Sequence, residues 1–330
     1  MPDIIGPKNG IREVILSHEP KQEVFVNTIT EDAPIIGNDI LFMPASNNIV
    51  NKYEKARDVQ GPKRVDLDAP LQLLSVVSDL LETKLFKIAG ALELPQDRIE
   101  AATQQWVAQW MSRKLPIALQ EGMANIEYSY LYDILLASCL ATPGRTINAN
   151  PSATGTGKYY TILGCAYDEG QNCGLYNPNR QNAMGGQQGA GNGDATQQTF
   201  FRIQALWNGG LGKLSNDASG YSWDVSAMLG FQQANEKKER AIVNIDEEHF
   251  PTYLELIQFA RSIKGNNARK HIYMSPAVAD LIISKYSNTN SNNALITVDQ
   301  EARLRIAGIP VTESDNFIDG EDAIPADAIA

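Results

Sequence analysis

Residues 95–122 read PQDRIEAATQQWVAQWMSRKLPIALQEG and carry a strong amphipathic pattern. Ile99, Trp106 and Trp110 recur at helical spacing on one face, while polar side chains occupy most of the remainder. Pro95 stands where a first-turn proline is tolerated, because the N–H that it lacks would have no partner there. At about 1.5 Å per residue the helix would be roughly 40 Å long, which is more than a compact domain usually needs. We therefore predict a strut whose three apolar residues pack against the body of the protein.

Pro116 interrupts this pattern. A proline inside a helix removes one backbone hydrogen bond, and its ring clashes with the preceding turn. We expect the first helical segment to kink or end near Leu115, and helical character to resume from Ile117 to Ala141.

The composition is that of a folded protein and argues against several functions. The chain has 330 residues, of which 43% are hydrophobic and 20% charged, and this length suits two lobes. A net charge of −11 argues against a dedicated nucleic-acid binder, which normally displays a large basic patch. No apolar run reaches the roughly 18 residues of a membrane span, and the N-terminus lacks the order of a signal peptide. Three cysteines cannot all pair, and these are not arranged as CxxC, which favours a reducing compartment, so we expect synthesis in the cytoplasm.

The segments that precede the helix have too little apolar content to fold alone. Residues 1–35 are punctuated by proline and glycine and predict an extended N-terminal arm with one short helix around residues 10–16. Residues 36–70 predict a charged, two-stranded extended loop that projects from the body. The candidate contact residues of this loop are Lys52, Tyr53, Glu54, Lys55, Arg57, Asp58, Lys63 and Arg64.

The rest of the chain alternates helices and strands without the regular rhythm of a doubly wound sheet, so the predicted fold class is α+β. A strand beginning near Leu85 should return to the core before the long helix. We do not assign residues 223–245 to a helix or a strand. We further predict strands at 159–165, 271–274 and 304–317, a helix at 247–264 that buries Leu254 and Phe259, and a helix at 277–286 started by Ser275-Pro276.

No catalytic, cofactor-binding or metal-binding residue is predicted. Gly155-Thr156-Gly157-Lys158 resembles part of a phosphate-binding loop, but Ser152 and Tyr159 occupy the positions that require glycine and a small hydroxyl residue. His18, His249 and His271 are far apart, and none has a second ligand at metal spacing. The glycine-rich segment 184–194 leaves one enzyme hypothesis open, in which this segment closes as a lid over a pocket of a soluble α+β enzyme.

Three further stretches complete a resemblance. Residues 32–48, DAPIIGNDILFMPASNN, place an apolar strand and Pro-Ala-Ser-Asn after the arm, and residues 127–137, EYSYLYDILLA, follow the long helix. Residues 308–316, GIPVTESDN, match the loose pattern G-x-P-V-x-x-x-D near the end of the chain. Together with the arm, the extended loop and the spine-like helix, the sequence resembles the major capsid proteins of tailed bacteriophages of the Hong Kong 97 type.

This resemblance implies a domain organisation and a function. The expected parts are an arm (1–35), an extended loop (36–70), a peripheral domain with the spine helix (71–145), an axial domain (146–310) and a C-terminal strand and tail (311–330). The implied function is structural and not enzymatic: self-assembly into hexamers and pentamers of an icosahedral head, in the host cytoplasm, around double-stranded DNA. The implied partners are further copies of the chain, scaffolding and portal proteins, and DNA as a non-specific neighbour. No cofactor and no membrane is expected.

Overall fold

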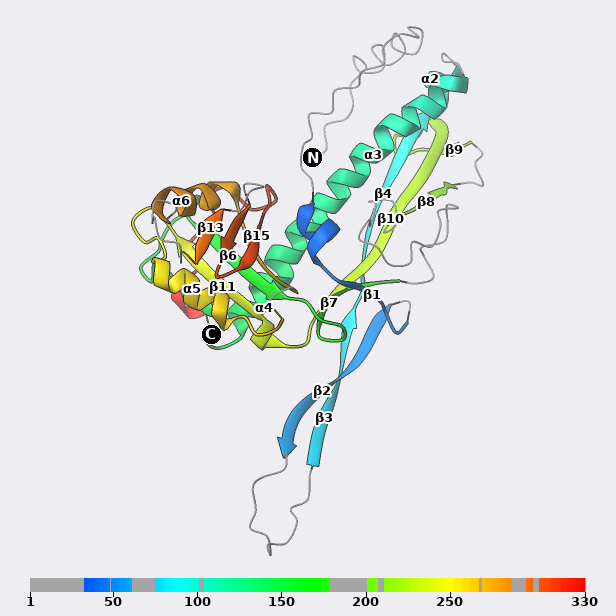
Figure 1. The fold of residues 1–330 in the computed structure, drawn as a ribbon. Coiled ribbons are helices and arrows are strands. Elements are labelled where there is room, and N and C mark those ends of the chain that lie inside the picture. The colour runs from blue at the N-terminus through cyan, green and yellow to red at the C-terminus, as the bar shows by residue number, and fades with distance from the viewer. Residues whose placement is uncertain are drawn as a thin grey trace, which may run out of the picture.

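The computed structural model describes residues 33–47, 49–60, 75–100, 104–177, 201–206, 211–266, 269–286, 295–298 and 303–329. The side chains of residues 98–99, 104–113, 115–116 and 201–205 lie outside the described part. Two lobes are joined by a long helix, and a hairpin projects from the end of one lobe (Figure 1). The arm expected at residues 1–35 falls almost entirely outside these ranges.

The first lobe is a sheet with the strand order β1-β7-β10-β4. β10 (Ser219–Gln233) pairs antiparallel with β4 (Phe86–Pro95) along the whole length of β4. The strand returning from Leu85 is therefore confirmed as β4. The other strands are β1 (Phe42–Pro44), which is parallel to β7 (Asn172–Tyr176), and β8 (Phe201–Ala205) and β9 (Gly212–Lys213), which both pair with β10.

A helical rod runs along this sheet and into the second lobe (Figure 1). It consists of α2 (Gln96–Glu100), α3 (Gln104–Ser129), the π-helical segment η2 (Tyr130–Leu136) and α4 (Ala137–Ala141). Pro116 lies within α3, so of the two expected alternatives, a kink or an end near Leu115, the end is wrong. A proline removes only one intrahelical hydrogen bond, and packing on a sheet supplies most of a helix's stability.

The second lobe is a seven-stranded sheet of order β13-β14-β15-β12-β6-β11-β5. Its strands are β5 (Thr146–Asn148), β6 (Tyr160–Ala166), β11 (Glu239–Ile245), β12 (Lys270–Met274), β13 (Ile296–Val298), β14 (Leu304–Ile306) and β15 (Ile309–Glu313). Helices α5 (Tyr253–Ser262) and α6 (Pro276–Tyr286) pack on it, with Phe259 and Ile282 fully buried in their shared core.

Local sequence explains where these two helices begin. Thr252 and Glu255 form a reciprocal capping box at the start of α5. Ser275 accepts a hydrogen bond from the backbone of Val278 at the start of α6, as expected from the Ser-Pro pair. Leu254 was expected inside but is 61% exposed, because the buried face of α5 centres on Leu256 and Phe259 and Leu254 lies opposite them.

The single strand expected at residues 304–317 is instead a hairpin. β14 and β15 pair antiparallel, and Ala307 and Gly308 form the turn with φ of 53° and 79°. Positive φ at both central residues is the geometry of a type I′ turn, which matches the twist of the flanking strands.

Two expected domain ranges differ from the strand pairing. β2 (Val50–Gln60) pairs with β3 (Ser75–Lys84), so the paired strands of the projecting hairpin are residues 50–60 and 75–84, whereas the expected range was 36–70. Moreover, β7 and β10 fall inside the range expected for the axial domain, yet they belong to the first sheet with β1 and β4. Each sheet is therefore assembled from distant parts of the chain, which contiguous ranges cannot describe.

Candidate assembly interface

The projecting hairpin is a two-stranded sheet of its own. Opposite residues run from Val50 and Lys84 near the body to Gln60 and Ser75 at the far end of the described part. The register shifts at Arg57, and such a bulge bends and twists a strand locally. Because only Leu85 separates β3 from β4, the hairpin continues the first lobe outward (Figure 1).

Contacts at the root hold the hairpin to the body. The side-chain amide of Asn51 donates to Oε1 of Gln232 at 2.7 Å, and Lys55 forms an ion pair with Glu236 at 2.6 Å. Gly230 of β10 packs directly against Leu85 at the root of the hairpin, and a Cβ at this position would come within 2.7 Å of the Leu85 side chain. Glycine at this position is what lets β10 approach the root.

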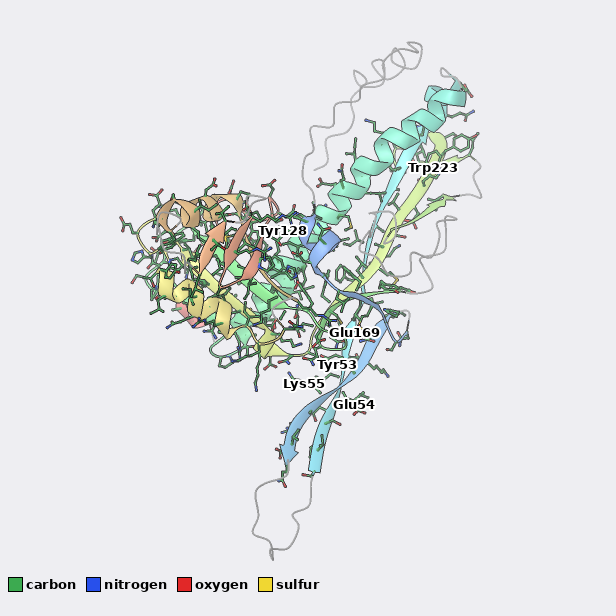
Figure 2. The ribbon with its side chains drawn as sticks, in the orientation of Figure 1. Tyr53, Glu54, Lys55, Tyr128, Glu169 and Trp223 are labelled. Atoms are coloured by element: carbon green, nitrogen blue, oxygen red, sulfur yellow. The ribbon has the colours of Figure 1, made fainter. Side chains whose placement is uncertain are left out.

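The structure brings together most of the residues predicted for the extended loop. Lys52, Tyr53, Glu54, Lys55, Arg57 and Asp58 all lie on β2, and Figure 2 labels Tyr53, Glu54 and Lys55 where the hairpin leaves the body. Lys63 and Arg64 lie outside the described residues. The side chains of Ile99, Trp106 and Trp110 also lie outside them, so their packing along the helix stays a prediction.

Sequence reasoning missed an apolar stripe on one face of the hairpin, formed by Val59, Val76 and Leu80. Val59 and Val76 lie directly opposite each other, and Leu80 follows four residues along the same face of β3. These side chains are 59%, 67% and 68% exposed. The apolar residues of this stripe on β3 are visible in the sequence of residues 76–81, VVSDLL. An apolar run predicts that its side chains are buried, but it does not say whether the same chain or another chain buries them.

A second feature that the sequence did not reveal is a buried carboxylate, which we call the Glu127 clasp. Glu127 of α3 accepts hydrogen bonds from the backbone N–H groups of Ile35 and Ile36 at 2.9 and 3.1 Å. It also accepts from the Ser314 hydroxyl and from the side-chain amide of Asn316, the latter at 3.0 Å. Burial raises the pKa of Glu127, and the four donors counteract this effect. One side chain thus ties together segments from both ends of the chain.

The C-terminal segment that leaves β15 lies across the second lobe. Glu321 accepts hydrogen bonds from the hydroxyls of Tyr132 and Thr161, and the Asn244 side chain bonds the backbone of Ile324 in both directions. The segment therefore connects η2, β6 and β11, and its root beside Asn316 is held by the Glu127 clasp.

Glu239, at the start of β11, predicts a pH dependence of stability. Its side chain is fully buried and accepts a hydrogen bond from the Ser138 hydroxyl at 2.6 Å, and burial raises its pKa from 4.5 to about 7. Between these values the folded state holds a proton that the unfolded state has lost, so the free energy of unfolding falls as the pH rises through this window. The decrease in the free energy of unfolding that Glu239 causes should amount to roughly 3 kcal/mol and should level off above pH 7.

Denaturant unfolding of the wild type and of Glu239→Gln, at pH steps from 4.5 to 8, isolates this effect. The difference between the two proteins should change with pH, because the amide does not titrate. A constant difference across the range would contradict the raised pKa.

Comparison with known proteins was made at the levels of sequence and structure. No protein-family profile and no curated protein matches the sequence. A structure of bacteriophage Epsilon15 contains a similar chain, with a TM-score of 0.64, 13% identity and coverage of 99% of this chain and 100% of that one. A chain of the bacteriophage JBD30 capsid covers 95% of this chain and 99% of its own length, with a TM-score of 0.55 and 10% identity.

These similarities define the class of fold. The chain has the Hong Kong 97-type capsid fold, which confirms the α+β prediction and, at the level of the fold, the resemblance. At such low identity the similarity concerns the fold. Within the described residues, no group of histidine, cysteine, aspartate and glutamate is arranged to hold a metal ion. No helix in that part of the chain is long and apolar enough to cross a membrane.

Proposed function

We propose that this chain is the structural major capsid protein of a tailed bacteriophage. In this proposal it self-assembles into hexamers and pentamers of an icosahedral head that encloses double-stranded DNA. The observation that carries the proposal is the end-to-end similarity of fold to a chain of a phage capsid, which leaves little of either chain unmatched. The role is structural, and no catalytic step is assigned to any residue.

The hairpin supports assembly because its apolar stripe is uncovered within the described part of the subunit. Every described residue of β3 except Thr83 is exposed, and none of the described elements covers Val59, Val76 or Leu80. Covering such a surface with a neighbouring copy would stabilise the pair by about 25 cal/mol per Å² of apolar area removed from water. Closed symmetric shells repeat each such contact many times, so modest contacts suffice once the costs of association are met.

The charged residues of the hairpin fit a role in orientation. Lys52 lies opposite Glu82, and Lys55 lies opposite Asp79, so both signs are interspersed along the ribbon. Exposed ion pairs contribute only about 0–1 kcal/mol each. Lys52, Glu54, Arg57 and Asp58, together with Lys63 and Arg64, would then set register between subunits more than affinity.

The remaining partners follow from the same proposal. Scaffolding and portal proteins would guide closure of the shell in the host cytoplasm, and the finished protein would reside in the virion. Packaged DNA would be a non-specific neighbour, since a net charge of −11 suits a container that does not hold its contents tightly.

The enzyme alternative rests on the glycine-rich segment 184–194, which lies outside the described residues. Limited proteolysis distinguishes the two hypotheses. For a shell protein, cleavage in the arm and in the hairpin should be fast in the free subunit and slow after assembly. For an enzyme, substrate would protect residues 184–194 instead.

The direct test is assembly itself. Expression of the full chain with its scaffolding protein should yield sedimentable closed particles or capsomers that are visible by electron microscopy. A strictly monomeric product under all assembly conditions would refute the proposal.

A further inference from the structure

A groove on the surface lies between the end of α3 and the C-terminal segment. Ala124 and Tyr128 of α3 form one wall, and Phe317 and Ile318 form the other. Its volume is about 250 Å³, below the roughly 300–1,000 Å³ of typical small-molecule sites. Tyr128 and Ile318 are 42% and 39% exposed, and Figure 2 labels Tyr128 where α3 enters the second lobe. The size fits a few side chains of a peptide segment.

The groove is negatively charged. Glu121, one to two turns before Tyr128, and Asp315 both line it, and neither forms an ion pair with another described residue. The nearby Glu313 has a raised pKa because of burial and of the negative charges of Asp280 and Asp315. An apolar groove with acidic walls suits a segment that is apolar on one side and basic beside it.

The N-terminal arm enters the described structure beside this groove. Ile35 and Ile36 bond the same Glu127 carboxylate that holds Ser314 and Asn316. Glu127 lies between groove residues Ala124 and Tyr128 along α3. The described structure begins at Ala33, two residues before Ile35, so the arm joins it close to the groove.

The arm contains one segment of matching chemistry. Residues 8–16 read KNGIREVIL. At helical spacing Ile11, Val14 and Ile15 share one face, Lys8 and Arg12 lie along its edge, and Glu13 lies on the opposite side. The apolar face would fit between Tyr128 and Ile318, with the two cations toward the acidic walls.

We propose that, in the unassembled subunit, residues 8–16 of the arm dock into the groove of their own chain. The connecting residues 17–32 have a root-mean-square span of roughly 20–25 Å if they behave as a flexible chain, which readily covers the separation. Such a short tether gives an effective concentration in the millimolar range, so weak contacts suffice to fill the groove. This inference concerns the single subunit and does not depend on the proposed capsid function.

Disulfide crosslinking of the full-length, unassembled chain tests the proposal. Val14→Cys is combined with Asn125→Cys, an exposed position in the groove, while Cys139, Cys165 and Cys173 are buried and give little background. We expect an intramolecular disulfide to form at least about tenfold faster than in the control pair Val14→Cys and Leu254→Cys, because of the difference in effective concentration. Leu254 is exposed on α5, away from the groove.

Equal rates in the two pairs would overturn the proposal, and so would a disulfide that joins two chains. Charge exchange provides a second measurement. Glu121→Lys or Arg12→Glu alone should slow crosslinking about threefold to fivefold at low salt, and the two together should restore it. If the folded double variant does not regain the wild-type crosslinking rate, Arg12 does not lie beside Glu121 in the groove.

Discussion

Replacing Glu127 with alanine is expected to lower the free energy of unfolding by roughly 4 kcal/mol or more. The substitution leaves two backbone N–H groups and the side chains of Ser314 and Asn316 without their acceptor, and all four are buried at this junction. A buried donor without a partner costs about 1–3 kcal/mol, and the lost side chain also leaves a cavity. Denaturant unfolding followed by fluorescence measures the loss.

Glu127→Gln and Glu121→Ala are the matched controls. The glutamine keeps the size of the side chain and one strong acceptor, so we expect an intermediate loss of about 1–2 kcal/mol. Glu121 lies on the same helix but is exposed, so its replacement should change stability by less than about 0.5 kcal/mol. A loss below about 1 kcal/mol for Glu127→Ala would show that the clasp is not a main stabilising contact between the two ends of the chain.

Placing charge on the apolar stripe is expected to abolish assembly while leaving the subunit folded. Val76→Asp and Leu80→Asp together would bury two unpaired carboxylates in any interface that covers this face. Because every subunit contributes the same contact, the loss multiplies over the shell. We expect at least a hundredfold fall in particle yield, measured by sedimentation, with an unchanged unfolding midpoint.

Leu254→Asp provides the control, since Leu254 is 61% exposed and Leu80 is 68% exposed. This change should leave assembly close to that of the wild type. Normal particles from the doubly charged hairpin would show that the stripe is not covered by a neighbouring copy.

The long helix illustrates how much of the fold the sequence could predict. Its amphipathic pattern predicts the rod correctly, because a helix more than ten residues long repeats its period several times. The same reasoning left open a kink or an end near Pro116, and the end was wrong, since local propensity cannot weigh one lost hydrogen bond against packing on a sheet.

β10 shows the opposite case. Residues 219–233, SGYSWDVSAMLGFQQ, alternate from Tyr221 to Phe231 with only Met228 breaking the pattern, and the strand is buried on both faces in its second half. It lies between β4 and β7, so neighbours on both edges and both faces determine its burial. Residues 223–245 were not assigned from the sequence, although the alternation up to Phe231 predicts a strand with one buried face. The burial of the second face by neighbouring elements is what the alternation does not contain.

The candidate interface was predicted in part. The charged residues of β2 were assigned to a projecting loop, because a segment poor in apolar residues cannot build a core. The second strand was misplaced, because residues from 71 onward were assigned to the peripheral domain, although Val76, Val77, Leu80 and Leu81 lie exposed on β3 of the hairpin. Hydrophobicity measures how strongly a side chain avoids water, but it contains no information on which molecule covers it.

By itself, the sequence determined the local elements: the rod, the starts of α5 and α6, and the absence of enough core in the hairpin. These depend on interactions within a few residues, such as capping, periodicity and turn geometry. Only the tertiary structure decided the Glu127 clasp, the apolar stripe and the groove beside the arm. Each of these joins residues that are far apart in the chain, such as Ile35, Glu127 and Asn316, and a sequence read along its length does not contain their distances.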